Sequence, residues 1–347
     1  MRAALWHLGG LGDVYDAAHL GIAIREADAP SFFAIYVRNQ VQADLVRTMC
    51  HNGSPVFDYV IISDLGWDEG VGQQSHRWDV FYEWKPYVAV RWTPVGDDRS
   101  RPDKRSMPRE MKSAYKHMLS KHTNRLRNLG LSVHEVGCAS LGIEPVPCDW
   151  LSVVIPGRRD AAIRVAADRQ YLTVNNGSDA GLRKNVRQTK EWTVEQWAEV
   201  IARVRGDFPR LKVIHVGATG EPHIPGAFSL VGETSVLDML YLLERSLLHL
   251  GPENGAVRLA RATGTDSVVV YGPTDPTLYA LSGNSGLRTD VCEPCFWKSG
   301  DWMFRCTNSW GRMCMQMLSV DDVYDAVAAR IDEAMAGESN HQQDGEV

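Results

Sequence analysis

The chain has 347 residues, of which 44% are hydrophobic and 23% charged, with a formal net charge of -6 at pH 7. These values exclude collagen-like, disordered and disulfide-dense small scaffolds. The length favours two domains, the charge gives no indication of nucleic-acid binding, and no apolar run is long enough for a transmembrane helix. Gly9 and Gly10 follow the short N-terminal apolar run at once, so we expect no signal peptide and a cytoplasmic protein.

Short apolar runs alternate with helical patterns in the first half of the chain. The run Arg2–Leu8 ends in a glycine turn, and the pattern after it predicts a helix over Asp13–Ala27. Further buried strands are predicted at Ser31–Val37, Asp58–Ile62 and Trp78–Trp84. This alternation predicts an α/β domain with a parallel sheet.

A basic segment follows, from Arg99 to Arg127. It holds ten Lys and Arg residues, opposed only by Asp103 and Glu110, and so carries a local charge of +8. From Pro108 onward its pattern is helical. The segment is either a solvated helix face or a surface that meets an acidic substrate.

The second half repeats this architecture after the break at Pro156-Gly157. Strands are predicted at Tyr171–Asn175, Leu211–Val216, Ser246–Leu250 and Ser267–Tyr271, and helices from Thr193 to Arg205 and at Ser235–Glu244, Gly255–Thr263 and Val320–Ala336. Thr193 and Gln196 have the spacing of a capping box, and Ser319 precedes the final helix as a cap. We therefore expect two α/β domains, residues 1–160 and 161–347.

Two loops at predicted strand ends carry candidate site residues. Asp13 follows Gly9-Gly10-Leu11-Gly12, which lacks the third glycine of the dinucleotide fingerprint, so a nicotinamide cofactor is not indicated. Asp13 is either a carboxylate at the sheet edge where ligands bind or a plain helix cap. The second loop, Pro252–Arg258, opens a helix whose N–H groups suit a phosphate, and Gly255 permits close approach of a ligand.

Five short motifs occur in the order found in one enzyme family. They are Gly12-Asp13-Val14, Lys190-Glu191-Trp192, Gly232-Glu233-Thr234-Ser235, Pro252–Arg258 and Val270-Tyr271-Gly272-Pro273-Thr274. Through them residues 1–335 resemble the ADP-heptose heptosyltransferases, glycosyltransferase family 9. The resemblance implies a GT-B fold, in which two Rossmann-like domains with parallel sheets face each other across a cleft. It also implies that the N-terminal domain binds the acceptor, that the C-terminal domain binds the nucleotide sugar, and that the final helix crosses back to the N-terminal domain.

The resemblance further implies an inverting transfer of a heptose-like sugar, with ADP-heptose as the donor. Asp13 matches the catalytic base, and Lys190 matches the lysine near the leaving group, although a solvated lysine at a helix start is the alternative. The implied donor-binding residues are Asn175, Asn176, Gly217, Ala218, Glu233, Glu253, Asn254, Gly255 and Arg258. Arg258 stands where the family usually has histidine, so either donor recognition is altered or activity is weakened.

The cysteine module at residues 292–314 contains Cys292, Cys295, Cys306 and Cys314. In a reducing compartment such clustering favours a metal, and four thiolates can close a tetrahedral site around zinc or iron. The alternative is a set of unligated thiols packed in a core. Similar cysteines occur in the autotransporter heptosyltransferases, which resemble this chain here and bind iron. A closed site has a structural role, and we expect no metal in the transfer step.

Two other functions stay open at this stage, a non-catalytic binding or assembly protein with a GT-B shell and a nucleotide-sugar epimerase. The expected partners are a nucleotide-sugar donor and an acceptor that is a glycan, a protein or a small molecule. The basic segment suits an acidic acceptor, such as phosphorylated lipopolysaccharide core. We expect no nucleic acid and no membrane span, and an oligomer is compatible with the sequence.

Overall fold

The computed structural model describes residues 1–7, 9–65, 73–85, 88–92, 129–157, 170–177, 188–299, 301–308 and 310–343. The basic segment 99–127 lies outside these ranges. The chain divides into two compact units. Unit 1 comprises Met1–Pro156, Thr277–Tyr279 and Trp297–Gly300, and unit 2 comprises Gly157–Pro276, Ala280–Phe296 and Asp301–Val347.

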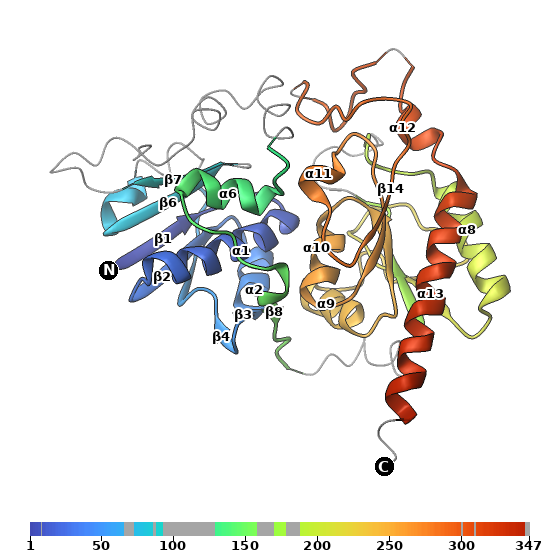
Figure 1. Cartoon of the computed structure of the whole chain (residues 1–347), viewed down its shortest axis with the longest axis horizontal. Helices are drawn as coiled ribbons and strands as arrows, with labels where there is room; N and C mark the ends of the chain where they lie inside the picture. Colours follow the sequence, from blue (N-terminus) through green and yellow to red (C-terminus); the bar gives the residue numbers. More distant parts are fainter. Residues whose placement is uncertain are drawn as a thin grey trace. The chain divides into compact units, whose positions relative to one another are not determined.

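Unit 1 contains a five-stranded sheet in the order β5-β2-β1-β6-β7 (Figure 1). Its strands are β1 (Arg2–Trp6), β2 (Phe32–Val37), β5 (Tyr59–Ile62), β6 (Val80–Lys85) and β7 (Val88–Trp92). The first four are parallel, as predicted, and α-helices lie in the connections from β1 to β2 and from β2 to β5, whereas β7 pairs antiparallel with β6. A small antiparallel sheet adds β3 (Met49–His51), β4 (Ser54–Pro55) and β8 (Ser152–Val153).

The helices of unit 1 are α1 (Leu11–Asp28), α2 (Gln40–Thr48) and α6 (Val133–Leu141), with 3-10 turns at Ser75–Arg77 and Cys148–Trp150. In α1 every residue from Val14 to Ile24 is buried. The helix packs inside the unit, where it contacts both α2 and α6, and its buried stretch includes the polar residues Asp16 and His19. This burial fixes the start of α1, where Asp13 lies.

Unit 2 contains a six-stranded parallel sheet in the order β11-β10-β9-β12-β13-β14. Its strands are β9 (Tyr171–Val174), β10 (Lys212–His215), β11 (Phe228–Ser229), β12 (His249–Pro252), β13 (Ser267–Val270) and β14 (Ser285–Leu287). Its helices are α8 (Val194–Asp207), α9 (Val236–Glu244), α10 (Gly255–Ala262), α11 (Pro276–Tyr279, of which Thr277–Tyr279 cluster with unit 1), α12 (Met313–Gln316) and α13 (Val320–Gln343). Figure 1 shows α9 and α10 on one side of the strands and α8 and α13 on the other.

The predicted caps of unit 2 are confirmed. The Thr193 hydroxyl accepts a hydrogen bond from the Gln196 amide at 3.0 Å, and the Gln196 side chain accepts one from the Thr193 amide at 3.3 Å. The Ser319 hydroxyl accepts from the Asp321 amide at 3.1 Å at the start of α13. These caps satisfy N–H groups that have no partner inside a helix.

The final helix packs its apolar side chains within unit 2. Val323, Val327 and Ile331 are fully buried in the core of unit 2, where α13 packs against α8, β13 and β14. These side chains form a stripe at helical spacing that covers one face of the sheet of unit 2. The crossing of this helix to the N-terminal domain stays a prediction.

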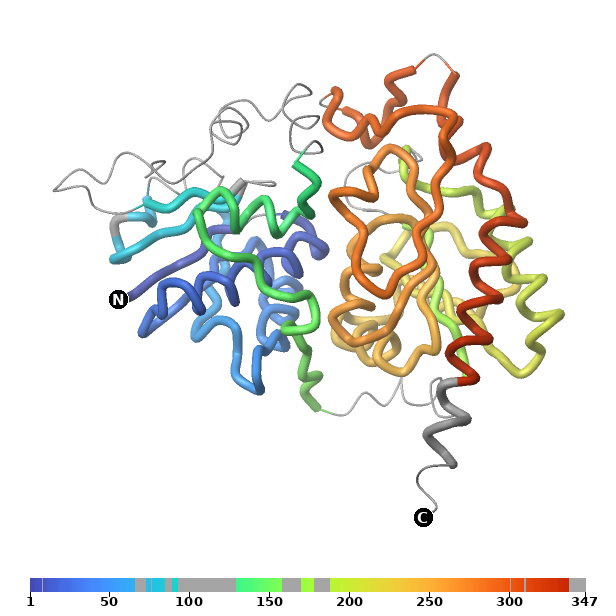
Figure 2. Tube along the Cα trace, in the orientation of Figure 1, coloured from blue at the N-terminus to red at the C-terminus, as the bar shows by residue number. Residues whose placement is uncertain are grey.

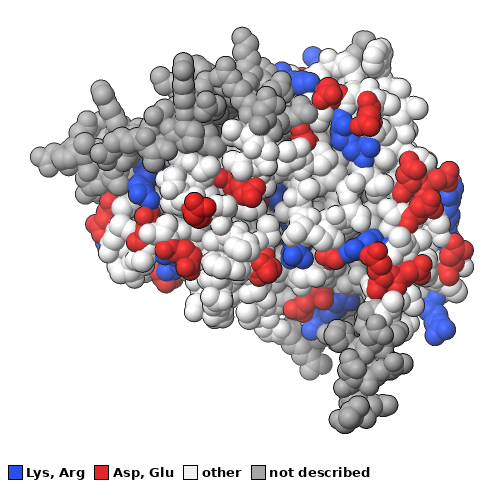
Figure 3. Space-filling view, viewed as in Figure 1, with Lys and Arg blue, Asp and Glu red and all other residues white. Residues whose placement is uncertain are grey.

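Charged side chains of unit 2 lie beside charges of the opposite sign on the face shown in Figure 3. Along α8 and α13, Arg203 pairs with Glu199 at 2.8 Å and with Asp321 at 2.5 Å. On this face, the described part of unit 2 forms no separate basic patch. Exposed pairs of this kind contribute little to stability.

Candidate functional sites

Asp13 lies in the first turn of α1, directly after the carboxyl end of β1. Gly10 is the N-cap of α1, and its amide donates to Oδ2 of Asp13 at 2.6 Å. The side chain of Asp13 is exposed. The structure thus gives Asp13 a role in capping, while its second oxygen has no hydrogen-bond partner among the described residues.

Gly9 must be glycine for Asp13 to take this position. A Cβ atom at residue 9 would lie 2.4 Å from Oδ2 of Asp13, closer than real Cβ contacts, whereas one at Gly10 would lie at 3.6 Å, an ordinary contact. The glycine turn therefore allows the carboxylate to fold back over the backbone. This need for close approach explains the first glycine of the motif.

In unit 2, Lys190 and Glu253 form a buried ion pair, although 63 positions separate them in sequence. The Lys190 ammonium donates to Oε2 of Glu253 at 2.6 Å and to its carbonyl at 3.3 Å, and the two side chains are 13% and 6% exposed. Lys190 is thus not a solvated lysine, and the alternative raised from the sequence is wrong. It lies at the carboxyl edge of the sheet, where Glu253 follows β12.

A second cation, Arg258, acts electrostatically on the same carboxylate. Burial opposes ionisation of Glu253, but the charges of Lys190 and Arg258 outweigh it and hold the pKa of Glu253 below its ordinary value. Arg258 is 5% exposed. Burial and the charge of Glu253 raise the pKa of the neighbouring Tyr271, so its hydroxyl is a neutral hydrogen-bonding group. In this group Lys190 is ion-paired with Glu253, and the charge of Arg258 also stabilises the Glu253 carboxylate.

The helix that follows, α10, is capped by its own asparagine. Oδ1 of Asn254 accepts from the amides of Ala256 at 2.9 Å and Val257 at 3.3 Å. Two of the N–H groups expected to bind phosphate are therefore already satisfied. The amide of Gly255 has no hydrogen-bond partner among the described residues and is the donor that this helix start offers.

The side chains of Asn175, Asn176 and Asn254 tie the strand ends of this edge together. Nδ2 of Asn254 donates to Oδ1 of Asn175 at 2.5 Å, and Nδ2 of Asn175 donates to the carbonyl of Val216 at 2.9 Å. Oδ1 of Asn176 accepts from the indole of Trp197 at 2.6 Å. These amides thus hold β9, β10 and β12 in place, which the sequence did not reveal.

Glu221 is a site residue that the sequence reasoning missed. Its carboxylate accepts from the amide of Ala218 at 3.0 Å and from Nδ2 of Asn175 at 3.1 Å, and it occupies the space beside Gly217 that a Cβ would fill. Burial is the main cause that raises its pKa. The signal in the sequence is a glycine-flanked loop after β10 that ends in an acid, Gly217 to Glu221.

Glu233 lies on the loop next to Gly217. The amide of Gly232 donates to the carbonyl of Gly217 at 2.9 Å, and Gly232 has a positive φ of 74°. The side chain of Glu233 is exposed. The structure therefore brings the loops that carry Gly217, Ala218 and Glu233 together, and the roles assigned to these residues stay predictions.

The polypeptide between the cysteines packs against the turn that carries Lys190. The Thr189 amide donates to the carbonyl of Met303 at 2.8 Å, and its hydroxyl donates to the carbonyl of Trp302 at 2.9 Å. The Lys190 ammonium lies 5.5 Å from the centroid of the Trp302 ring, within cation–π range. Trp302 thus flanks Lys190.

All seven cysteines lie in the described residues, and none forms a disulfide. Burial and the charges of Cys292, Cys295 and Cys306 raise the pKa of the Cys314 thiol to about 12, so the four sulfurs are close enough to affect one another. The Cys306 thiol donates to the carbonyl of Gly311 at 2.8 Å. Within the described ranges no three His, Cys, Asp or Glu side chains are arranged to hold a metal ion. The module emerges from unit 2 between β14 and α13 (Figure 2).

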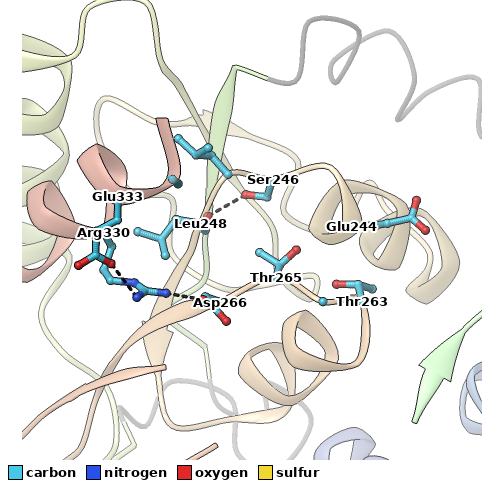
Figure 4. Close-up of a pocket in the computed structure, with 11 residues that line it drawn as sticks. Glu244, Ser246, Leu248, Thr263, Thr265, Asp266, Arg330 and Glu333 are labelled. Atoms are coloured by element: carbon cyan, nitrogen blue, oxygen red, sulfur yellow. Dashed lines mark hydrogen bonds and ion pairs between the residues drawn. The ribbon is translucent and has the colours of Figure 1, made fainter. Parts of the chain in front are cut away.

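A cavity of about 380 Å³ lies elsewhere in unit 2. Figure 4 shows Ser246, Thr265, Asp266 and Arg330 around it, on segments that precede β12 and β13 and on α13. It is therefore at the amino edge of the sheet, opposite the edge that carries Glu253. The hydroxyl groups of Ser246 and Thr265 donate hydrogen bonds to backbone carbonyls, and Arg330 forms an ion pair with Asp266. This cavity contains none of the predicted site residues.

In the described part of the chain, we find no helix whose length and apolar content would let it cross a lipid bilayer.

Comparisons with known proteins show which solved structures have a similar fold. No family model matches the sequence, and no curated protein matches it. Among solved structures, the ADP-heptose LPS heptosyltransferase II of E. coli has a TM-score of 0.58 at 14% identity, covering 96% of this chain and 99% of that one. A family 9 glycosyltransferase from Veillonella parvula has a TM-score of 0.56 at 15% identity, covering 96% and 97%. The iron-containing heptosyltransferase TibC of enterotoxigenic E. coli, in its complex with ADP-D-β-D-heptose, has a TM-score of 0.62 at 14% identity, covering 96% and 76%.

At such low identities these similarities establish the fold alone. Together with the parallel strands in the main sheet of each unit, they confirm the predicted fold class, an α/β protein of the GT-B type with two Rossmann-like units.

Proposed function

We propose that the chain is an inverting glycosyltransferase that moves a heptose-like sugar from ADP-heptose to an acceptor hydroxyl. One observation carries the proposal: Lys190 is ion-paired with Glu253 before the start of α10, and the charge of Arg258 acts on the same carboxylate, so two cations are available to neutralise a departing diphosphate. The fold shared with heptosyltransferases supports it. Residues 1–160 then form the acceptor domain and 161–347 the donor domain.

Asp13 acts as the general base. A hydroxyl is a weak nucleophile until its proton is removed, and a carboxylate with one oxygen fixed and the other open can accept that proton. The acceptor oxygen bonds to the anomeric carbon while the bond from that carbon to the diphosphate breaks. The proton passes to Asp13, and the configuration at carbon inverts because attack comes from the face opposite the leaving group.

The leaving diphosphate gains negative charge as its bond to the sugar breaks. Lys190 and Arg258 neutralise that charge, and the amide of Gly255 donates to a phosphate oxygen. Glu253 orients the ammonium of Lys190 at 2.6 Å before the donor binds. Arg258, where histidine is usual in the family, keeps its charge at every physiological pH, so the charge on this side of the site is constant.

The remaining donor contacts come from the loops after β9 and β10. Asn175 positions Asn254 and Glu221, while Asn176, Gly217, Ala218 and Glu233 line the approach to the nucleoside. Glu221 adds a carboxylate held by Ala218 and Asn175. Carboxylates of this kind accept hydrogen bonds from sugar hydroxyls.

We also propose a structural metal, zinc or iron, on Cys292, Cys295, Cys306 and Cys314. The spacing of these cysteines in the sequence supports it, and TibC, whose fold is similar, contains iron. Four cysteines leave no open coordination position, so no step of the transfer involves this metal. Elemental analysis is expected to give about one zinc or iron per chain, lost when Cys292 and Cys295 are both replaced by serine. Fully folded protein without metal contradicts this part.

The test of the main proposal is release of ADP from ADP-heptose, compared with other nucleotide sugars. Asp13→Asn is expected to lower kcat about 10²–10⁴-fold while donor affinity stays unchanged, because the base touches the acceptor side only. Asp44→Asn, an exposed carboxylate on α2 of unit 1, is the matched control.

Three outcomes contradict parts of the proposal. Donor binding without turnover of any nucleotide sugar identifies a non-catalytic binding protein. Full activity of Asp13→Asn removes Asp13 from the role of base. Epimerised donor without transfer identifies an epimerase.

A further inference from the structure

The glycine turn before α1 is held by two buried side chains of unit 1. The amide of Gly9 donates to Nε2 of His7 at 3.2 Å, and the carbonyl of Gly9 accepts from Nε2 of Gln42 at 2.6 Å. His7 is 2% exposed and Gln42 is 4% exposed. Both polar groups of Gly9 are thereby satisfied by side chains in a turn where neither strand nor helix supplies a partner.

His7 can accept this bond because its ring is neutral. Burial lowers the pKa of His7 to about 4, against the opposing charge of Asp13. Its ring packs on Trp84, with centroids 5.3 Å apart. Nε2 therefore keeps its lone pair for the amide of Gly9, and the packing fixes the direction of that bond.

Gln42 is fixed at both ends of its amide. Its Oε1 accepts from the backbone amide of Arg38 at 2.8 Å, while its Nε2 donates to Gly9. The backbone amide of Gln42 is bound to the side chain of Asn39, the N-cap of α2. Gln42 thus connects the start of α2 to the glycine turn.

The backbone amide of Gly10 links the Gly9 turn to Asp13. Gly10 donates to Oδ2 of Asp13 at 2.6 Å, and the space for that carboxylate exists because Gly9 has no side chain. We propose that His7 and Gln42 are positioning residues that hold the Gly9–Gly10 turn and so fix the orientation of Asp13. This inference rests on the proposed role of Asp13 as base.

Two matched pairs of variants test it. His7→Gln keeps an acceptor near the place of Nε2, whereas His7→Leu removes it. Gln42→Met removes the donor to Gly9, and Gln40→Met is its control, an exposed glutamine on the same helix bound to Asp44. The measurements are amide hydrogen exchange of Gly9 and Gly10, kcat and KM for ADP release from ADP-heptose, and the melting temperature.

His7→Leu and Gln42→Met are expected to speed exchange at Gly9 and Gly10. They should lower kcat about 10–100-fold with KM for the donor unchanged, because a small displacement of the base slows the reaction without affecting the donor. His7→Gln should restore kcat to within about threefold of the original, since the acceptor returns. Gln40→Met should leave both measurements unchanged.

Unchanged exchange and unchanged kcat in His7→Leu and Gln42→Met overturn the inference. So does a higher KM at constant kcat, or an equal loss in Gln40→Met. If His7→Leu fails to fold, the inference is tested by amide exchange and kcat in Gln42→Met and His7→Gln. If Asp13→Asn keeps full activity, the proposed function fails instead, and amide exchange alone decides whether the two side chains hold the turn.

Discussion

The starts of α1 and α10 are the same kind of junction, a strand that ends in a turn and a helix, yet they present charge in opposite ways. The carboxylate of Asp13 is exposed and bound to a backbone amide. Lys190, Glu253 and Arg258 are largely withdrawn from water, with Lys190 and Glu253 ion-paired and the charge of Arg258 acting on the same carboxylate. Solvent screens an exposed charge far more than a buried one. The junction at α1 therefore depends on the orientation of the Asp13 carboxylate. The junction at α10 depends on the electrostatic interactions among its charged side chains.

The largest expected effect is on the stability of unit 2. Glu253→Leu leaves Lys190 and Arg258 buried without their carboxylate, which should lower the free energy of unfolding by about 3–5 kcal/mol in urea titrations at pH 7. Lys190→Met combined with Glu253→Leu should recover part of this loss. A loss below about 1 kcal/mol means that the pair behaves as an exposed one, and the contrast between the two junctions disappears.

Acid should destabilise the protein in two steps. Burial lowers the pKa of His7 and His215 from 6.5 to about 4 and that of His249 to about 3. The unfolded chain binds protons from about pH 6.5 downward while the folded chain does not, so the free energy of unfolding falls as the pH drops from 6.5 to 4. The stability from Glu253 is present above its ordinary value of 4.5 and is lost as the pH falls through its lowered pKa.

Urea titrations at pH 7, 5 and 4 check this dependence. His249→Asn keeps an acceptor or donor for the Thr173 hydroxyl, which lies 3.0 Å from Nδ1, but removes the titrating group. Its stability should therefore fall less between pH 7 and pH 4. If the free energy of unfolding of His249→Asn has the same pH dependence as that of the unchanged protein, His249 does not contribute to the loss of stability in acid.

A change at the first junction should affect activity rather than stability. In Gly9→Ala the new Cβ would lie 2.4 Å from Oδ2 of Asp13, so the carboxylate must move, and kcat for ADP release should fall about 10²-fold. Gly10→Ala is the control, because its Cβ would lie at 3.6 Å. Equal kcat values in the two variants show that the exact place of Asp13 does not matter.

The smallest effect concerns the cap of α10. Asn254→Ala should cost about 1 kcal/mol in unfolding free energy, as should Thr193→Ala at the cap of α8. Because Asn254 also joins β9 to β12, only its variant should weaken binding of the donor, as measured by calorimetry. Equal donor affinity in both variants shows that the amide contacts among the strand ends serve the fold alone.

Most of the regular structure was predictable from apolar runs and caps. The strands at residues 2–6 and 267–270 and the capping box of α8 follow from local patterns. The strand predicted at Ser246–Leu250 begins later, at His249, because Ser246 bonds to the carbonyl of Leu248 and the amide of Thr173. Strands as short as β11 and β14 have two or three residues and show no periodicity.

The sequence indicated candidate site residues, whose roles stay predictions, but it did not indicate the contacts between them. Local spacing indicated Asp13 and the Pro252–Arg258 turn, since both stand at a strand end followed by a helix. The pairing of Lys190 with Glu253 joins positions far apart in the sequence, so no local pattern contains it. For the same reason the sequence did not indicate that Glu221 would fill the space beside Gly217.

Because α13 is the last helix of the chain and packs in the core of unit 2, the main sheet of unit 1 can form during synthesis before the core of unit 2 is complete. The main sheet of unit 1 is complete once residue 92 has been synthesised, so it can form early. The core of unit 2 lacks Val323, Val327 and Ile331 until α13 emerges. The apolar surface of α8 and β13 that this helix covers stays accessible to chaperones, proteases and other nascent chains during that interval.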